Sequence, residues 1–302
     1  MFAKRWDTVH VGRDGWLFLT GGSNRVMDQY GRGPRRWWRL RAWARLIEAR
    51  AVRAARLGIR SVHLIVPEKL SVYDNLTADL PYDPARAATR ILARRLLRQP
   101  AYLDLLQPFR AARDGAPLYL RTDTHWSVEG CLLAYRELMR ALGAVPPADI
   151  ATRPRFEAER LMDLGEKLPG RPRERVSHLV IQRAAERVHA GPLVAAYEAE
   201  GRASELHTGA HVIYRNAVPG IDGRRLVLFG DSYAHFTPIM LTGLLAESFA
   251  EVHFVWSSSL DWGYIERVRP DLLVFELAER FLARLPRDDY DVAAARPDLE
   301  SA

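Results

Sequence analysis

Three apolar runs in the C-terminal part of the chain place the tightest limit on its fold. They are "RLVLFGDS" (225–232), "EVHFVW" (251–256) and "DLLVFEL" (271–277), and each has the length of a buried β-strand. The segments between them, 237–249 and 264–270, carry helical patterns. Strands with almost no polar positions are buried on both faces, as in parallel sheets covered by helices. The sequence therefore predicts an α/β fold with a mainly parallel sheet.

The rest of the chain fits the same plan. Helices are expected at 35–57, 84–98 and 127–143, and strands within 11–20 and at 61–67, 101–105, 117–121 and 177–182. Prolines, arginines and single apolar residues alternate from 145 to 216, so we expect an insertion or subdomain there. The 302 residues are enough for one large α/β domain, and we expect residues 1–302 to form one domain that carries this insertion.

Composition removes several classes of protein. Cys131 is the only cysteine, which excludes an intramolecular disulfide and a cysteine-based zinc site. The net charge of +7 comes almost entirely from arginine and leaves an anionic partner open. The Arg/Trp-rich helix at 35–57 could bind a membrane surface or a nucleic acid, although we expect it to pack on the sheet with its arginines in solvent. The N-terminus lacks the apolar stretch of a signal peptide, and no segment has membrane-spanning character, so no export signal is expected.

Ser232 ends the strand at 225–232 and precedes a predicted helix. A serine at this position is either a nucleophile at the carboxyl edge of the sheet or a polar cap on the helix. The backbone N–H groups at a helix start could stabilise an oxyanion, and Gly230 allows a tight turn. The motif Gly-Asp-Ser lacks the second glycine of the lipase elbow, so it does not decide between the two interpretations.

A nucleophilic serine needs a base and a group that orients the base. Asp123 and His125 lie two residues apart in "YLRTDTHWSVEG", between a predicted strand and a predicted helix. His235 is the competing base, three residues after Ser232. A metal cluster of Asp123, His125, Asp231 and His235 is the chemical alternative, but neither a metal-binding motif nor a nucleotide-binding motif occurs. We therefore predict no metal and no cofactor.

Several segments together resemble the SGNH-hydrolase-like domain of the alginate O-acetyltransferase family, the AlgX/AlgJ type. They are "VGRDGWLFL", "VPEKLSVY", "LYLRTDTHWSVEG", "RLVLFGDSYA" and "PDLLVFELAERFL", in the family's order from about residue 9 to residue 283. The resemblance implies a three-layer α/β/α sandwich, permuted so that the Asp and His block precedes the Ser block. It assigns Ser232 as nucleophile, His125 as general base and Asp123 as the carboxylate that orients it.

The same resemblance implies an activity and partners. It implies transfer of an acetyl group to polysaccharide hydroxyls through an acyl-serine, with an acetyl donor, a polysaccharide acceptor and exopolysaccharide assembly proteins as partners. We expect the substrate pocket to use Lys69, Tyr73, Trp126, Tyr233, His235 and Arg280. The resemblance predicts a periplasmic location, because family members are typically periplasmic. The cytoplasm is the alternative, because no signal peptide is visible. The alternatives are a serine esterase that deacetylates glycans and a non-catalytic glycan-binding protein; nucleic acid is not an expected partner.

Overall fold

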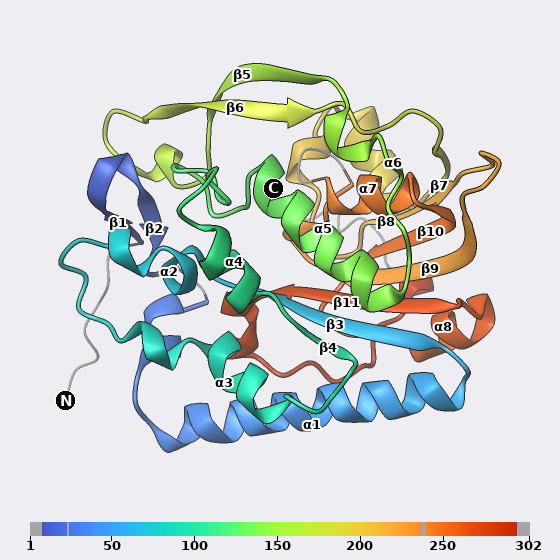
Figure 1. Cartoon of the computed structure of the whole chain (residues 1–302), viewed down its shortest axis with the longest axis horizontal. Helices are drawn as coiled ribbons and strands as arrows, with labels where there is room; N and C mark the ends of the chain where they lie inside the picture. The colour runs from blue at the N-terminus through green and yellow to red at the C-terminus, as the bar shows by residue number, and fades with distance from the viewer. Residues whose placement is uncertain (1–7, 23, 237–239, 295–302) are drawn as a thin grey trace.

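A seven-stranded, mostly parallel sheet forms the centre of the molecule (Figure 1). The computed structural model describes residues 8–22, 24–236 and 240–294. The strand order is β4-β3-β11-β9-β10-β8-β7, in which β4, β3, β11, β9 and β10 are parallel. β8 pairs antiparallel with β10, and β7 pairs antiparallel with β8. The bounds are β3 Arg60–Val66, β4 Tyr102–Asp104, β7 Glu186–Ala190, β8 His211–Arg215, β9 Asp222–Gly230, β10 Phe249–Trp256 and β11 Leu272–Ala278. The parallel sheet predicted from the three apolar runs is confirmed.

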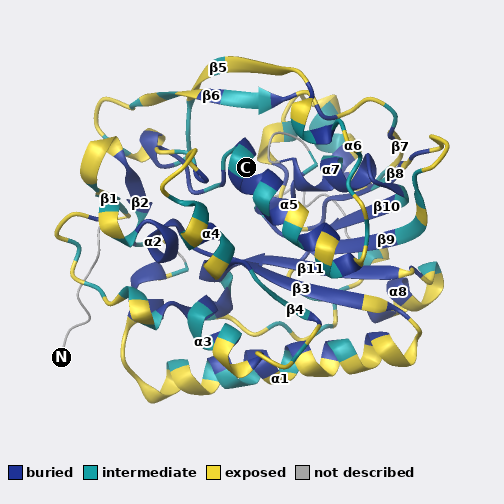
Figure 2. Ribbon diagram, viewed as in Figure 1, coloured by how far each residue is buried: buried dark blue, intermediate teal, exposed yellow. Residues whose placement is uncertain are grey.

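Helices cover both faces of this sheet and complete three layers. Their bounds are α1 Pro34–Arg56, α2 Lys69–Val72, α3 Ala88–Arg95, α4 Leu106–Ala112, α5 Val128–Leu142, α6 Pro192–Ala199, α7 Leu241–Ala246 and α8 Trp262–Val268. Alternate residues of β9 explain the two cores: Leu226 and Leu228 pack toward α5 and α7, whereas Val227 and Phe229 pack toward α1 and α8. The strands at the centre of the sheet, β3 and β11, are almost fully buried, whereas the edge strand β7 is exposed. The outer side of α1 is also exposed (Figure 2). Within the described ranges, no helix is long and apolar enough to cross a membrane.

Two antiparallel hairpins lie outside the main sheet. β1 (Val9–Val11) pairs with β2 (Leu17–Leu19), and β5 (Arg155–Leu161) pairs with β6 (Arg173–Leu179). The irregular stretch 145–216 contains β5 and β6 and also supplies β7, α6 and β8, so part of it extends the main sheet. In Figure 1 the β5–β6 hairpin lies on the side of the molecule away from α1.

Some predicted elements differ from the structure. The strand expected at 117–121 is absent: Tyr119 forms only an isolated bridge with Trp126, because the backbone folds back on itself and Leu120 N–H donates to the His125 carbonyl. The helix expected over 84–98 shortens to α3, after a separate turn at Pro84–Arg86. Ser232 is followed by one turn of 3-10 helix, Ser232–Ala234, and not directly by a long helix. The predicted helix at 237–249 starts at Leu241 in the structure, and its first three residues lie outside the described part of the chain.

Candidate active site

Ser232 lies at the carboxyl end of β9, on a turn that the sequence shapes closely. A Cβ atom at Gly230 would lie 2.7 Å from Ala234 Cβ and 2.9 Å from Glu276 Oε2, so only glycine fits the approach to the turn. The Asp231 carboxylate accepts hydrogen bonds from Tyr233 N–H (2.8 Å) and from Ala278 N–H (2.7 Å). Asp231 thus joins the turn that carries Ser232 to the end of β11.

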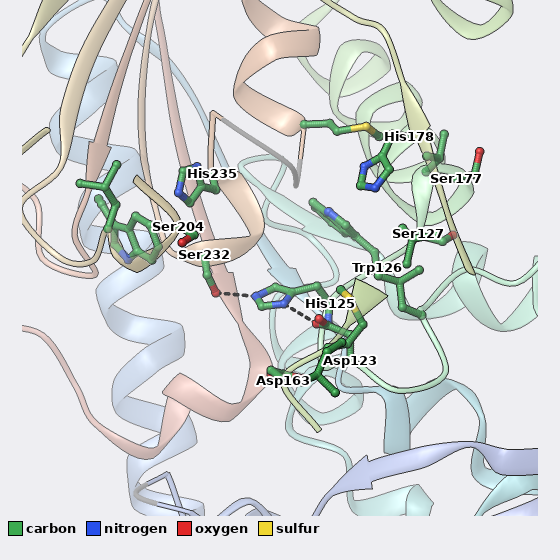
Figure 3. Close-up of a pocket in the computed structure, with 18 residues that line it drawn as sticks. Asp123, His125, Trp126, Ser127, Asp163, Ser177, His178, Ser204, Ser232 and His235 are labelled. Atoms are coloured by element: carbon green, nitrogen blue, oxygen red, sulfur yellow. Dashed lines mark hydrogen bonds and ion pairs between the residues drawn. The ribbon is translucent and has the colours of Figure 1, made fainter. Parts of the chain in front are cut away.

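Asp123, His125 and Ser232 form a continuous hydrogen-bonded chain (Figure 3). Asp123 Oδ1 lies 2.6 Å from His125 Nδ1, and it also accepts the His125 backbone N–H at 2.7 Å. His125 Nε2 lies 2.8 Å from Ser232 Oγ. A carboxylate only accepts hydrogen bonds, so the imidazole proton belongs on Nδ1, which leaves Nε2 to accept from the serine hydroxyl. Two segments more than a hundred residues apart therefore meet in the order that a nucleophilic serine needs.

The charges of this chain favour a basic imidazole. Burial lowers the pKa of His125, but attraction and hydrogen bonding to Asp123 outweigh burial and leave that pKa above 6.5. Burial opposes ionisation of Asp123, yet His125 and Lys69 hold its pKa at about 2. His235 differs, because burial and repulsion by His125 lower its pKa to about 4. His235 is therefore neutral at pH 7 and lies outside the hydrogen-bonded chain.

The loop that carries Asp123 and His125 is held by the β5–β6 hairpin region. The Asp163 carboxylate accepts Thr124 N–H at 2.8 Å and the Thr124 hydroxyl at 2.6 Å. The Glu174 carboxylate accepts the N–H groups of Arg121 and Thr122, both at 2.8 Å. Sequence reasoning missed both acidic residues, and no spacing signal marks them, since they lie about 40 to 50 residues downstream in the irregular stretch.

Lys69 lies beneath the same loop and not in the pocket. Its Nζ atom donates to the carbonyls of Asp123 (2.5 Å), Leu120 (2.6 Å), Leu17 (2.9 Å) and Arg121 (3.1 Å). Burial lowers the pKa of Lys69 to about 8, although Asp123 and other acidic neighbours oppose that shift. Because its hydrogen-bond partners are all backbone carbonyls, the Lys69 ammonium links these segments of backbone. Lys69 is not among the residues that line the cavity.

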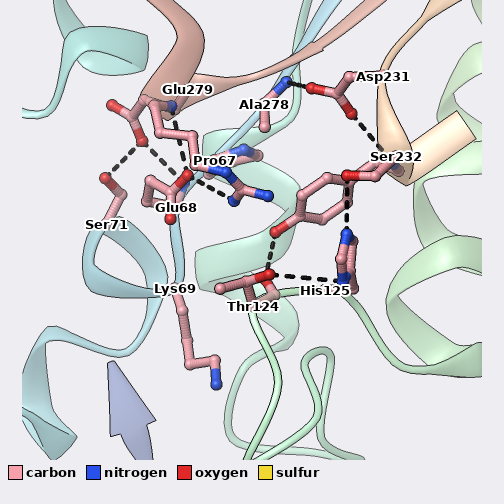
Figure 4. A network of polar contacts seen from close by, with 12 residues as sticks. Pro67, Glu68, Lys69, Ser71, Thr124, His125, Asp231, Ser232, Ala278 and Glu279 are labelled. Atoms are coloured by element: carbon pink, nitrogen blue, oxygen red, sulfur yellow. Dashed lines mark hydrogen bonds and ion pairs between the residues drawn. The ribbon is translucent and has the colours of Figure 1, made fainter. Parts of the chain in front are cut away.

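Tyr73, Tyr233 and Arg280 are also buried. Figure 4 shows the polar contacts that surround Glu68, Thr124 and Ser232. The Tyr73 hydroxyl accepts Leu118 N–H at 2.9 Å. The Tyr233 hydroxyl donates to the Thr124 carbonyl, and the Arg280 guanidinium lies 5.2 Å from the centre of the Tyr233 ring. Arg280 also pairs with Glu68 at 3.0 Å, and not with its neighbour Glu279. These three side chains do not line the pocket described next.

A cavity of about 540 Å³ opens beside Ser232 and His125 (Figure 3). Of the six side chains expected in a substrate pocket, the cavity brings in Trp126 and His235. The Trp126 ring packs edge-on against Tyr233, with ring centres 5.0 Å apart. Met240 and Trp256 add apolar surface, and the stretch 145–216 supplies Leu161, Met162, Asp163, Val176, Ser177, His178, Ser204 and Leu206. Nearly half of the wall therefore comes from the segment whose pattern was least regular.

The metal cluster considered from the sequence is not formed by its expected members. In the described part of the chain, the acidic and histidine groups close enough to share an ion are Asp123, His125 and Asp163, within 4.8 Å of one another. Asp231 is instead engaged by two backbone N–H groups. Each of the three clustered groups already has a hydrogen-bond partner, which accounts for their positions without an ion.

Known proteins resemble this chain in sequence. The family model described as "SGNH hydrolase-like domain, acetyltransferase AlgX" matches residues 9–196, a stretch that contains Asp123 and His125 and ends before Ser232. A probable alginate O-acetylase AlgJ of Pseudomonas syringae pv. tomato is 33% identical over 97 residues, which cover 30% of this chain and 24% of that protein. The matches span about a quarter to a third of the length of the curated relatives.

Solved structures share the fold. The O-acetyltransferase domain of Pseudomonas putida AlgJ matches with a TM-score of 0.58 at 19% identity, over 95% of this chain and 98% of that chain. A DHHW family protein from Eubacterium siraeum matches with a TM-score of 0.59 at 14% identity, over 76% and 80%. The SGNH-like fold expected from the resemblance is thus confirmed. Because the family model covers more than half of the 302 residues, this chain belongs to the AlgX/AlgJ alginate O-acetyltransferase family, with an SGNH hydrolase-like domain.

Proposed function

We propose that this protein is an O-acyltransferase that moves an acetyl group to a polysaccharide hydroxyl through an acyl-serine at Ser232. The observation that carries the proposal is the chain Asp123–His125–Ser232, with distances of 2.6 Å and 2.8 Å, at the wall of a cavity. Membership of the acetyltransferase family supports the choice of an acetyl group. The printed names of the relatives support a glycan as acceptor.

In the first half-reaction Ser232 Oγ attacks the acyl carbonyl of the donor while its proton passes to His125 Nε2. Asp123 holds the imidazole by Nδ1 and stabilises the imidazolium that forms. The Ser232 backbone N–H is the candidate donor to the oxyanion. Collapse of the tetrahedral intermediate breaks the bond to the donor's leaving group, which takes the proton from His125.

The second half-reaction reverses these roles. A sugar hydroxyl gives its proton to His125 Nε2 and attacks the acyl carbon, and Ser232 Oγ leaves and recovers the proton. Water can replace the sugar hydroxyl, which would make the protein an esterase. The apolar wall of the cavity, including Trp126 and Trp256, supports transfer because it limits the access of water to the acyl-serine.

The remaining site residues divide into two groups. Trp126 and His235 line the cavity, and we assign them to contact with the acyl group or the acceptor. The other four, Lys69, Tyr73, Tyr233 and Arg280, act through other residues, by holding the backbone around Asp123 and Ser232. We propose that the protein works in the periplasm, because members of the family are typically periplasmic. We also propose exopolysaccharide assembly proteins as its partners.

The test begins with p-nitrophenyl acetate and intact-protein mass spectrometry. We expect a rapid mass increase of one acetyl group, absent in Ser232→Ala. We also expect Ser232→Ala and His125→Ala to lower turnover by about 10³-fold or more. Ser259→Ala is the matched serine control, because Ser259 bonds Asp289 on the surface, and its turnover should equal that of the wild type.

A second step separates transfer from hydrolysis. The acetylated protein is mixed with oligosaccharides, and acetylated sugar and free acetate are measured. Acetylated sugar as the main product supports the transferase, whereas acetate alone identifies an esterase. Full activity in both Ser232→Ala and His125→Ala would refute the catalytic chain. A glycan-binding protein without catalysis would bind sugar in Ser232→Ala and never acquire the acetyl group.

A further inference from the structure

The first part of α1 and the helix α3 present an unusual concentration of arginine. Residues 32–45 and 90–98 contain ten arginines and no acidic residue, and we call this surface the α1–α3 face. In the described part of the chain none of the ten forms an ion pair. Arginines elsewhere are commonly paired, as Arg187 is with Glu198 at 2.6 Å. The face is therefore strongly cationic, and its arginines have no carboxylate within ion-pair distance in the described part of the chain.

Two exposed tryptophans lie within this face. The Trp37 side chain is 43% exposed and the Trp38 side chain 59%, and their ring centres are 4.7 Å apart. The Arg41 guanidinium lies 5.4 Å and 5.8 Å from the two ring centres, and that of Arg95 lies 5.2 Å from Trp37. Leu97, two residues after Arg95, is 84% exposed. The two tryptophans and the guanidinium groups beside them thus share one outer surface, and an exposed leucine follows α3.

The concentration of charge has a cost for the protein alone. Burial lowers the pKa of Arg36, and repulsion by Arg39 and Arg86 adds to it, although Glu279 acts in the other direction. The Nε atoms of Arg36, Arg39 and Arg90 are buried, and in the described structure they have no hydrogen-bond partner. Guanidinium groups remain charged at neutral pH, so these groups repel one another until an anion approaches.

We propose that the α1–α3 face docks on an anionic phospholipid bilayer. The guanidinium groups can donate hydrogen bonds to the headgroup phosphates. Trp37 and Trp38 suit the membrane–water interface, because each indole has an apolar ring and one polar N–H group. Exposed Leu97 favours a bilayer over a polysaccharide or a nucleic acid, since neither polyanion offers an apolar layer. The attachment is peripheral, because the apolar side of α1, including Trp43 and Ile47, is packed on the sheet.

Docking in this way leaves the cavity open. In Figure 1 α1 lies on one side of the molecule and the β5–β6 hairpin on the other. The hairpin and its flanking turns line the cavity beside Ser232. A bilayer against α1 would therefore face away from the cavity, and the protein could bind a membrane and a soluble polymer together. The membrane proposal does not depend on the catalytic one.

Vesicle co-sedimentation of the full chain tests the proposal. The vesicles contain phosphatidylcholine alone or phosphatidylcholine with phosphatidylglycerol, at low and at physiological salt. We expect binding only to the anionic vesicles, weakened by salt. The triple variant Arg41→Gln/Arg45→Gln/Arg95→Gln should bind about 100-fold more weakly, at about fivefold for each arginine. The control Arg140→Gln/Arg202→Gln/Arg215→Gln removes the same charge from exposed, ion-paired positions and should bind like the wild type.

A second measurement follows the tryptophans directly. Lipids brominated on the acyl chain quench tryptophan fluorescence, and we expect quenching in the wild type that is mostly lost in Trp37→Phe/Trp38→Phe. Equal binding by the two triple variants would overturn the proposal, because net charge alone would then explain binding. Binding to a soluble polyuronate or to DNA, with none to anionic vesicles, would also overturn it and would assign the face to that polymer. Neither result bears on acyl-enzyme formation, which is measured separately.

Discussion

Replacement of Lys69 by methionine tests whether this residue positions the catalytic loop or binds substrate. The Lys69 ammonium donates to four backbone carbonyls and is 3% exposed. Methionine fills a similar volume but offers no donor. The Arg121 oxygen keeps a second donor, Leu17 N–H, so three carbonyls lose their partner.

The magnitude follows from two opposing contributions. Each buried carbonyl without a partner costs about 2 kcal/mol, so three cost about 6 kcal/mol. The pKa of Lys69 falls from 10.5 to about 8, and the variant recovers the corresponding cost of burying the charge, about 3 kcal/mol. We therefore expect Lys69→Met to lower the free energy of unfolding by about 3 kcal/mol.

Urea unfolding and steady-state kinetics with p-nitrophenyl acetate measure both effects. Because His125 lies on the loosened loop, kcat should fall by about 10- to 100-fold while KM changes little. Lys167→Met is the matched control: Lys167 is exposed, donates to the Asp163 carbonyl at 2.8 Å, and should change stability by less than about 0.5 kcal/mol. A Lys69→Met protein with unchanged stability and a raised KM would refute this reasoning and restore Lys69 as a substrate contact.

Three further predictions concern the centre of the site. Asp123→Asn should lower kcat by about 10²- to 10⁴-fold, and the acid limb of the pH–rate profile should move to lower pH because Asp123 raises the pKa of His125. Burial and repulsion by Asp231 raise the pKa of Glu276 above 4.5, so wild-type stability falls as pH rises above 4.5. Glu276→Gln should therefore be more stable than the wild type at pH 7 and equally stable at pH 4, in thermal unfolding followed at both pH values. Gly230→Ala places a Cβ 2.9 Å from Glu276 Oε2 and should abolish acyl-enzyme formation while a folded circular-dichroism spectrum remains.

The sequence predicted the parts of the fold whose patterns are local. The alternation in β9 explains why: with Leu226 and Leu228 on one side and Val227 and Phe229 on the other, a fully apolar run requires helices on both faces. The helix α1 was predicted within a residue or so at each end, because its buried positions recur at helical spacing and Gly58 follows it. The prediction of a strand at 117–121 was wrong because its pattern is too short to be specific. Its apolar residues are buried by loop contacts and not by strand pairing, and a short apolar run does not distinguish the two.

The candidate site was predicted less evenly. Asp123, His125 and Ser232 each lie beside a strand or helix boundary, so their residue types and positions carried a signal, and the structure brings them within hydrogen-bonding distance. Lys69 was expected near the site, but its sequence position did not indicate where its ammonium points. Its four carbonyl partners come together only in the folded backbone. Asp163 had no local signal at all, since its role depends on a long-range contact with Thr124.

Buried contacts around the hydrogen-bonded chain Asp123–His125–Ser232 hold its geometry. Tyr233 follows Ser232 directly, yet its hydroxyl donates to the carbonyl of Thr124, which precedes His125. The turn that carries Ser232 and the loop that carries His125 are thus joined by a bond independent of the one between the two side chains. Arg280 follows β11, stacks on the Tyr233 ring and pairs with Glu68, which follows β3. The ends of β11 and β3 thus support Tyr233 from behind. A site held by such buried partners loses alignment when any one is removed. Tyr233→Phe should therefore slow acylation, even though the hydroxyl that it removes bonds a backbone carbonyl and none of the side chains of Asp123, His125 and Ser232.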